Sequence, residues 1–210
     1  RGRGFFEEYV DDWYYTNVFF APDSQLSFLG QDPVVVDGQE RSSTDYIRRR
    51  WLDNDFYGTV FSAQYQKNKL GLTLGGGWNT YRGDHFGEVI WARYAPGLER
   101  GDRYYEDDST KDDGNLFLKA DYQWGDNWRL FADLQYRGVR YQANGRETGL
   151  VDDRFRFFNP KAGITYTLDP GQNLYFSYAV ANREPNRNDY ENGNPRPERL
   201  NDFELGWRYL

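Results

Sequence analysis

The sequence predicts an all-β fold, namely about eight strands of an antiparallel transmembrane β-barrel. Three observations support this prediction. Apolar residues occupy every second position over segments of about nine to eleven residues, the length of a tilted strand that crosses a bilayer. The connections between these segments alternate between short and long, as they do in outer-membrane barrels. Aromatic residues gather at both ends of each apolar face, where amphipathic rings favour the two lipid–water interfaces.

The composition agrees with strands that are apolar on one face only. Hydrophobic residues make up 38% of the 210 residues and the mean hydropathy is −0.95, yet aromatic residues reach 19%, whereas disordered chains are poor in them. No apolar run approaches the roughly eighteen residues of a transmembrane helix. The net charge of −7 lacks the basic footprint of a nucleic-acid-binding protein, so we exclude that class. The absence of cysteine excludes a disulfide framework and thiolate chemistry.

The N-terminal part of the chain is predicted to contain the end of one strand and two further strands. Residues 1–9 have the pattern of a strand end, and residues 10–50 form a long polar and aromatic connection. Residues 55–65 alternate, and after a short connector at 66–69 the alternation continues in residues 70–78. The second face of this last strand is so rich in Gly and Thr that we expect room beside it for something bulky.

The middle of the chain repeats this arrangement. Residues 82–113 are predicted to form a second long connection, which includes an acidic run at 106–113. Residues 116–124 and 128–136 alternate as mirror images of each other. Gly125-Asp126-Asn127 joins them in a tight turn, because these residue types favour turn conformations.

The C-terminal part adds three more strands. Residues 142–154 are predicted to form a third long connection, followed by a strand at 158–168. Asp169-Pro170-Gly171-Gln172 is a strong turn signal. Strands at 174–180 and 203–209 flank a loop of about seventeen residues rich in Asn, Arg and Pro, far longer than a hairpin turn.

The aromatic residues at the ends of these strands are predicted to form two membrane-facing belts. They are Tyr57, Tyr65, Trp78, Tyr122, Trp124, Trp128, Tyr136, Phe158, Tyr166, Phe203, Trp207 and Tyr209. A soluble antiparallel sandwich or barrel also alternates, but its buried faces more often hold Val, Ile and Leu than terminal Tyr and Trp. We therefore favour the membrane barrel, and the long loops suit a barrel wider than the eight-stranded minimum.

The C-terminal segment carries motifs in a fixed order: Phe157-Phe-Asn-Pro-Lys-Ala-Gly, Asn173-Leu-Tyr-Phe-Ser-Tyr-Ala-Val-Ala, Asn182-Arg-Glu-Pro, Asn194-Pro-Arg-Pro-Glu and Asn201-Asp-Phe-Glu-Leu-Gly-Trp-Arg-Tyr. Together they resemble the β-barrel of TonB-dependent outer-membrane receptors, in a style similar to receptors from the Bacteroidetes. The resemblance is specific for residues 155–210 and supportive through the rest, although the spacing after Asn194 is slightly compressed relative to the family pattern.

The resemblance implies a barrel of 22 strands around an N-terminal plug domain. Residues 1–210 would then be part of a single outer-membrane β-barrel domain, with the plug domain and the last strands outside the chain. It further implies a location in the bacterial outer membrane, contact with TonB through the plug domain, and contact with the bilayer and lipopolysaccharide. No cofactor is expected.

The expected function is import of a scarce solute by TonB-coupled energy. We favour a metal chelate such as a siderophore, haem or cobalamin as the small-molecule ligand. An oligosaccharide-importing receptor, which would bind a glycan, is the first alternative. A passive porin or adhesin and an outer-membrane enzyme are others, but the single histidine argues against an enzyme.

Five residues are candidate ligand contacts. Arg183, Arg187, Tyr190 and Arg196 share the last long loop, and Trp91 belongs to an apolar patch in the second long connection. Clustered Arg, Asn and Tyr side chains suit an anionic or hydroxyl-rich ligand. The alternative is that they pack the loop and form salt bridges at the barrel mouth.

Three further groups are weaker candidates. Asp107, Asp108, Asp112 and Asp113 offer the hard oxygen ligands that Ca²⁺ prefers, but they lack the EF-hand spacing, and most acidic runs are solvated loops. His85 is expected in a solvated loop, because one histidine cannot form a His₂ or His₃ metal site. The run Arg48-Arg49-Arg50-Trp51 is expected either to meet lipopolysaccharide phosphates or to be solvated.

Overall fold

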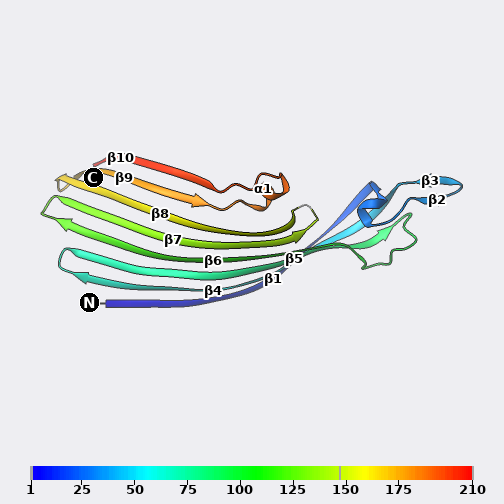
Figure 1. Ribbon diagram of the computed structural model, residues 1–210, viewed down its shortest axis with the longest axis horizontal. Helices are drawn as coiled ribbons and strands as arrows, with labels where there is room; N and C mark the ends of the chain where they lie inside the picture. Colours follow the sequence, from blue (N-terminus) through cyan, green and yellow to red (C-terminus); the bar gives the residue numbers. More distant parts are fainter. Residues whose placement is uncertain (1, 147, 210) are drawn as a thin grey trace.

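The computed structural model describes residues 2–146 and 148–209, with side chains described from residue 17 onward. Its main feature is one antiparallel sheet of eight strands in the order β1-β4-β5-β6-β7-β8-β9-β10, beside a small β2-β3 hairpin (Figure 1). The predicted fold class is confirmed. The elements are β1 (Gly2–Gln25), η1 (Leu26–Leu29), β2 (Val34–Val36), β3 (Gln39–Arg41), β4 (Ser43–Lys67), β5 (Leu70–Ala92), β6 (Arg103–Trp124), β7 (Trp128–Gly145), β8 (Gly149–Asp169), β9 (Gln172–Arg183), α1 (Arg187–Glu191) and β10 (Glu198–Tyr209).

The three predicted short turns all lie at one end of the sheet (Figure 1). They join β4 to β5, β6 to β7 and β8 to β9, and each leaves only two or three residues between the strands. Asn68 and Gly125 adopt positive φ angles of 50° and 65° there, a conformation that Asn and Gly tolerate best. We call this end the turn end and the opposite one the loop end. No helix among the described residues is long and apolar enough to span a membrane.

The predicted long connections are wrong in extent, because the strands continue far beyond the apolar alternation. The region 10–50 contains the second half of β1 and the start of β4, and the region 82–113 contains the end of β5 and the start of β6. The region 142–154 is mostly strand, and α1 lies in the last loop. Backbone pairing needs no apolar side chains, so the ladder persists where the side-chain pattern that predicted the strands ends.

The register places the predicted belt residues on one face of the sheet. Phe61, Gly76, Leu116, Tyr136 and Phe158 form one cross-strand row. Because alternate residues of a strand share a face, this row puts every belt residue on the same side, which we call the apolar face; the other is the polar face. The apolar face is open: on the central strand β6 the Leu118 and Trp124 residues are 43% and 59% exposed. A soluble sandwich would bury such a face against a second sheet.

Aromatic rings of neighbouring strands fill the space beside the glycines of the polar face, where the sequence predicted room for something bulky. Phe117 lies opposite Gly75, and Phe131 lies opposite Gly163. A Cβ atom on Gly75 would be 2.5 Å from Cζ of Phe117, and one on Gly163 would be 2.2 Å from Cε1 of Phe131. The expected room is therefore filled at these positions by side chains of neighbouring strands, an arrangement that helps fix strand register.

A small hydrophobic core stabilises the loop end. Leu29, Tyr46, Val89 and Tyr104 are buried together, and Phe28 of η1 packs against them. The guanidinium carbon of Arg48 lies 5.8 Å from the Phe28 ring centroid, a cation–π distance. This core holds η1 against β4, β5 and β6, so that Phe28 is fixed at the edge of the cavity described next.

Candidate ligand-binding site

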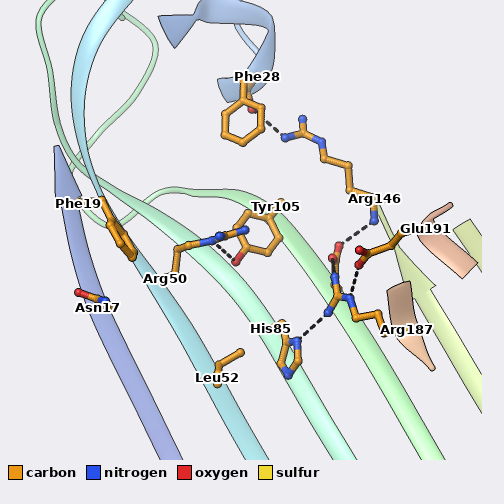
Figure 2. Close-up of a pocket in the computed structure, with 11 residues that line it drawn as sticks. Asn17, Phe19, Phe28, Arg50, Leu52, His85, Tyr105, Arg146, Arg187 and Glu191 are labelled. Atoms are coloured by element: carbon orange, nitrogen blue, oxygen red, sulfur yellow. Dashed lines mark hydrogen bonds and ion pairs between the residues drawn. The ribbon is translucent and has the colours of Figure 1, made fainter. Parts of the chain in front are cut away.

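A cavity of about 430 Å³ opens on the polar face near the loop end (Figure 2). Its volume lies within the range of about 300–1,000 Å³ typical of small-molecule sites. It is lined by Asn17, Phe19, Phe28, Arg50, Leu52, His85, Tyr105, Asp107, Arg146, Arg187 and Glu191. These residues come from β1, η1, β4, β5, β6, the connection after β7, and α1.

The sheet register brings the central residues of the cavity together. Leu52 lies opposite His85, which in turn lies opposite Asp107. Arg50, two residues before Leu52, therefore shares its face in the next row, toward the loop end. The site is a continuation of the polar face beyond the region of apolar alternation.

Arg50 is held in place by Tyr105. Its Nε donates to the Tyr105 hydroxyl at 3.2 Å, and its guanidinium carbon lies 5.6 Å from the ring centroid. Figure 2 shows the two side chains side by side. Gly87 allows this placement, since a Cβ atom there would lie 2.4 Å from Cε1 of Tyr105.

Arg187 joins α1 to the wall of the cavity. Its Nε donates to Glu191 at 2.6 Å, and its Nη2 lies 3.4 Å from Oδ2 of Asp107. Its Nη1 lies 3.1 Å from Nδ1 of His85. A capping box between Asn186 and Asp189 begins the helix, so Arg187 is the first helical residue.

His85 is neutral in this environment. Burial and the neighbouring Arg187 charge lower its pKa from 6.5, whereas Asp107 and Asp84 act more weakly in the opposite direction. The contact with Arg187 requires an acceptor at Nδ1, which assigns the ring proton to Nε2. The expectation of a solvated loop histidine is therefore wrong, because His85 lies in β5 and lines the cavity.

Arg146 connects the tip after β7 to η1. Its backbone N–H donates to Oδ1 of Asp107 at 2.9 Å, and its Nη1 donates to the Phe28 carbonyl at 3.0 Å. The guanidinium carbon is 4.8 Å from the Phe28 ring centroid. Asp107 thereby accepts hydrogen bonds from two segments that are distant in sequence, through the backbone of Arg146 and the side chain of Arg187.

The balance of charges makes the cavity cationic. Among the lining residues whose side chains the structure describes, three guanidinium groups face two carboxylates, those of Asp107 and Glu191, and neutral His85 adds no charge. The rings of Phe19, Phe28 and Tyr105 supply apolar surface beside them. Guanidinium groups bind carboxylate and phosphate oxygens through charge-assisted hydrogen bonds. The arrangement suits an anionic ligand that also carries apolar or aromatic parts.

The structure brings one of the five predicted ligand contacts, Arg187, into the cavity. Tyr190 lies behind it as an anchor, with its hydroxyl donating to Asp153 at 2.8 Å. Arg183 pairs with Glu198 at 2.8 Å, and neither it nor Arg196 lines the cavity. Trp91 is 45% exposed and also outside it.

The sequence analysis placed Arg50 in a run expected to meet lipopolysaccharide phosphates or solvent, and it did not identify Tyr105 or Arg146 as ligand contacts. A signal was present for Arg50, because it continues the even-numbered polar face of the strand predicted at residues 55–65. Extending that strand backward would have placed it correctly. For Arg146 no such signal exists, since its position depends on contacts with η1 and Asp107.

In the described part of the structure, the acidic run is divided between the two faces of the sheet. Its residues lie in β6, so Asp107 and Asp113 point to the polar face, whereas Asp108 and Asp112 point to the apolar face. Asp113 accepts from Nε of Arg137 at 3.0 Å, and Asp112 accepts from Thr80. In the described ranges, no three His, Asp or Glu side chains form a group that could hold a metal ion.

The arginine run at residues 48–50 is likewise divided by strand geometry. Arg48 and Arg50 lie on the polar face, whereas Arg49 lies on the apolar side with its guanidinium carbon 5.7 Å from the Trp51 ring centroid. The run therefore does not present the single lipopolysaccharide-binding patch that its spacing suggested.

An ionic cluster of Lys111, Arg137 and Glu184, on the turn-end side of the cavity, anchors the last loop. Glu184 is 7% exposed and accepts hydrogen bonds from Lys111 of β6 and from Arg137 of β7, the latter at 2.8 Å. Burial opposes ionisation of Glu184, but these hydrogen bonds outweigh it and lower the pKa from 4.5 to about 2. The cluster reaches across β8 and positions the segment that leads into α1.

Comparisons with known proteins place this architecture in a family. The model of the "TonB dependent receptor-like, beta-barrel" family matches residues 4–210. No curated protein matches the chain.

Three solved structures share the fold. The chain is similar to the copper transporter OprC (TM-score 0.66, 14% identity, 98% of this chain and 34% of that chain). It is also similar to the ferric citrate transporter FecA in its unliganded form (0.53, 12%, 99% and 32%), and to P. aeruginosa FpvA bound to heterologous pyoverdines (0.53, 14%, 98% and 28%). The chain thus spans about a third of the length of these proteins, and at such identities the likeness shows the fold alone.

Proposed function

The chain belongs to the TonB-dependent receptor β-barrel family, and on this premise we propose that it forms part of the wall of an outer-membrane receptor that imports an anionic metal chelate. In this proposal, uptake is driven by energy coupled through TonB and a plug domain outside residues 1–210. The cationic cavity lined by Arg50, Arg146 and Arg187 is the observation that carries the choice of ligand.

The apolar face supports the location in the outer membrane. Its open Leu, Tyr and Trp side chains extend over a band that ends in aromatic residues on both sides. In water such a surface would be costly, at roughly 25 cal/mol for each Å² of apolar area left exposed. In a bilayer it is solvated by acyl chains, with the rings at the two interfaces.

The polar face supports contact with water and protein on the other side of the wall. Lys119 and Asp133 form an ion pair there at 3.6 Å, and the Phe131 ring lies 5.8 Å from the Lys161 ammonium. Charged groups of this kind are tolerated on the lumen side of a transmembrane barrel and not on the lipid side. We propose that the plug domain packs against this face at the turn end.

The cavity favours a chelate over a neutral glycan. The guanidinium groups of Arg50, Arg146 and Arg187 can form charge-assisted hydrogen bonds with an anionic chelate, whereas a neutral oligosaccharide offers them no opposite charge. Of the three similar structures, OprC is a copper transporter, FecA is a ferric citrate transporter, and FpvA was solved with bound pyoverdines. Those names describe the other proteins, so the choice here rests on the charge and rings of the cavity.

Uptake by the full-length receptor tests the proposal. A strain lacking the receptor gene is supplied with iron as ferric citrate or a ferric catechol chelate, with cobalamin, or with an oligosaccharide as the sole source. We expect a growth defect on a ferric chelate, and loss of chelate uptake when a protonophore collapses the inner-membrane proton gradient. A defect confined to the oligosaccharide would contradict the chelate assignment, and uptake that persists with the protonophore would indicate a passive pore.

A double variant tests the cavity itself. Each charge-assisted hydrogen bond contributes about 1.5–3 kcal/mol, and 1.4 kcal/mol corresponds to a tenfold change in affinity. Arg50→Gln with Arg146→Gln should therefore weaken chelate binding by at least about tenfold. Arg183→Gln is the matched control, because Arg183 pairs with Glu198 outside the cavity. Equal losses in both variants would exclude this cavity as the binding site.

A further inference from the structure

A second hollow lies on the apolar face, where the apolar band gives way to charged residues. It is a shallow groove of about 610 Å³ between β5 and β8. Trp78, Gly114, Gly138 and Arg156 form one cross-strand row across it. Arg140 and Arg154 form the row toward the loop end. The groove is separate from the ligand cavity, since the two open on opposite faces of the sheet.

The floor of this groove is bare backbone. A Cβ atom on Gly138 would meet nothing within 4 Å, and one on Gly114 would meet Cδ1 of Trp78 at 3.6 Å. The indole of Trp78 and the guanidinium of Arg156 therefore stand on either side of a strip without side chains. A slender molecule has room to lie there against the sheet.

The walls of the groove change from apolar to cationic along the strands. Leu116 and Tyr136, both 52% exposed, line it on the side of the apolar band. Arg156 lies beside Gly138, two residues beyond Tyr136, and Arg140 and Arg154 lie two residues farther. At about 3.3 Å per residue and a tilt near 45°, Arg156 and Arg154 are roughly 5 and 9 Å above Phe158, the belt residue of the same strand. The headgroup layer of a bilayer is of similar depth, about 5–8 Å on each side.

The charges on this rim are only partly compensated. Arg140 forms a two-pronged ion pair with Asp152, with both contacts at 3.0 Å. Asp112, opposite Arg140, accepts a hydrogen bond from Thr80. Arg154 and Arg156 are exposed and form no ion pair with any residue in the described ranges, although the Asp152 carboxylate that pairs with Arg140 also attracts Arg154. Two guanidinium groups thus remain available at the level of the lipid headgroups.

We propose that this groove binds a phosphate-bearing lipid of the outer leaflet, with its phosphate on Arg154 and Arg156 and an acyl chain along Leu116 and Tyr136. The inference rests on the outer-membrane location proposed above. Guanidinium forks match phosphate oxygens in geometry and charge. Free phosphate would use the arginines but not the apolar half of the groove, and this is why the occupant is a lipid.

Lipid binding to the full-length receptor in dodecyl maltoside tests this inference. The probe is diphosphoryl lipid A, titrated and counted by native mass spectrometry. We expect one retained lipid per receptor, and at least about tenfold weaker binding for Arg154→Gln with Arg156→Gln. The matched control is Arg82→Gln with Arg199→Gln. This control removes two exposed arginines from the same face of the sheet, and both lie outside the groove. Arg82 is four residues from the belt residue Trp78, and Arg199 is four residues from the belt residue Phe203.

Gly138→Leu provides a test that keeps both charges. Its side chain would enter the open groove without a backbone clash, and it should displace the lipid while leaving the fold intact. Resistance to unfolding by urea, measured on the same samples, verifies folding independently of both the lipid and the chelate. If the wild-type receptor binds the lipid but takes up no ferric chelate, only the proposed function is contradicted.

The remaining outcomes are equally decisive. Unchanged lipid binding in the Arg154/Arg156 variant or in Gly138→Leu would overturn the proposal. So would an equal loss in the Arg82/Arg199 control, which would mean non-specific charge attraction. Retention of dephosphorylated lipid A as strongly as the diphosphoryl form would exclude a role for phosphate. Full competition by millimolar inorganic phosphate would assign the site to a free anion instead of a lipid.

Discussion

Nη1 of Arg187 lies 3.1 Å from Nδ1 of His85, although the two residues are 102 positions apart in the chain. Arg187 is in the short helix of the last loop, and His85 is in the wall of the sheet. The contact couples the position of that loop to the cavity, so changes on either side of it should alter ligand binding and loop docking together.

Arg187→Gln should loosen the last loop and weaken chelate binding by about tenfold. The substitution removes the contacts of the guanidinium with Glu191, Asp107 and His85, and charge-assisted contacts of this kind contribute about 1.5–3 kcal/mol. Hydrogen exchange in residues 184–197 and chelate titration of the full-length receptor measure the two effects. Arg196→Gln, in the same loop but outside the cavity, should change neither. Normal exchange and affinity in Arg187→Gln would contradict the coupling.

His85 should make the receptor less stable as the pH falls below about 6.5. The lowered pKa of His85 in the folded state means that, between that pKa and the ordinary value of 6.5, the unfolded chain binds more protons. Stability then increases with pH in this window, so the contribution is fully present above pH 6.5 and is lost as the pH falls through the folded pKa. Thermal unfolding at pH 7.5 and 5.5 measures it, and His85→Gln should lack this part of the slope. An identical slope in both proteins would mean that His85 does not contribute.

Glu184→Gln should release the start of the last loop. Removing one partner of a buried ionic cluster leaves Lys111 without its carboxylate and Arg137 with Asp113 alone, at a cost of about 2–4 kcal/mol in loop docking. Because the pKa of Glu184 is lowered from 4.5 to about 2, its contribution is present above pH 4.5 and is lost as the pH falls through 2. Proteolysis of residues 184–197 should therefore be faster in the variant at pH 7. Equal cleavage of variant and wild type at that pH would show that the cluster does not hold the loop.

Leu118→Arg should destabilise the receptor in a bilayer. An arginine on the lipid face near the bilayer midplane costs about 2–4 kcal/mol, and Leu118 is an exposed residue in the middle of the apolar band. Lys119→Arg places the same side chain on the adjacent polar face and should change stability by less than about 0.5 kcal/mol. Folding of the full-length receptor into phospholipid vesicles, titrated with urea, compares the two. Similar stabilities would mean that lipid does not cover the apolar face.

The alternation of side chains made the transmembrane part of the fold predictable. Leu116, Leu118, Tyr122 and Trp124 lie on the face that their spacing indicated. The tight turn at Gly125 was likewise readable, because its residues favour a conformation that few others adopt. These features depend on neighbours within one or two strands, and such local information is present in a single sequence.

The candidate site was predictable only in part. Arg187 was recognised from its clustering with other loop residues. Its partner Asp107 was expected to be a weak Ca²⁺ ligand in the acidic run, and its partner His85 was expected in a solvated loop. Both assignments assumed that strands end where apolar alternation ends. Above the bilayer both faces of a strand meet polar surroundings, so the alternation fades while the backbone ladder from Ser43 to Ala92 continues.

Local residue patterns were therefore sufficient for the all-β class, the positions of the turns and the face that each membrane-level side chain occupies, since lipid on one side and polar surroundings on the other impose a period of two. How far the strands extend, and which residues meet in the cavity, became clear from the folded chain alone. Arg50, His85, Asp107 and Arg187 become neighbours through cross-strand register and through the docking of α1. Those are long-range contacts, and no local pattern of residues encodes them.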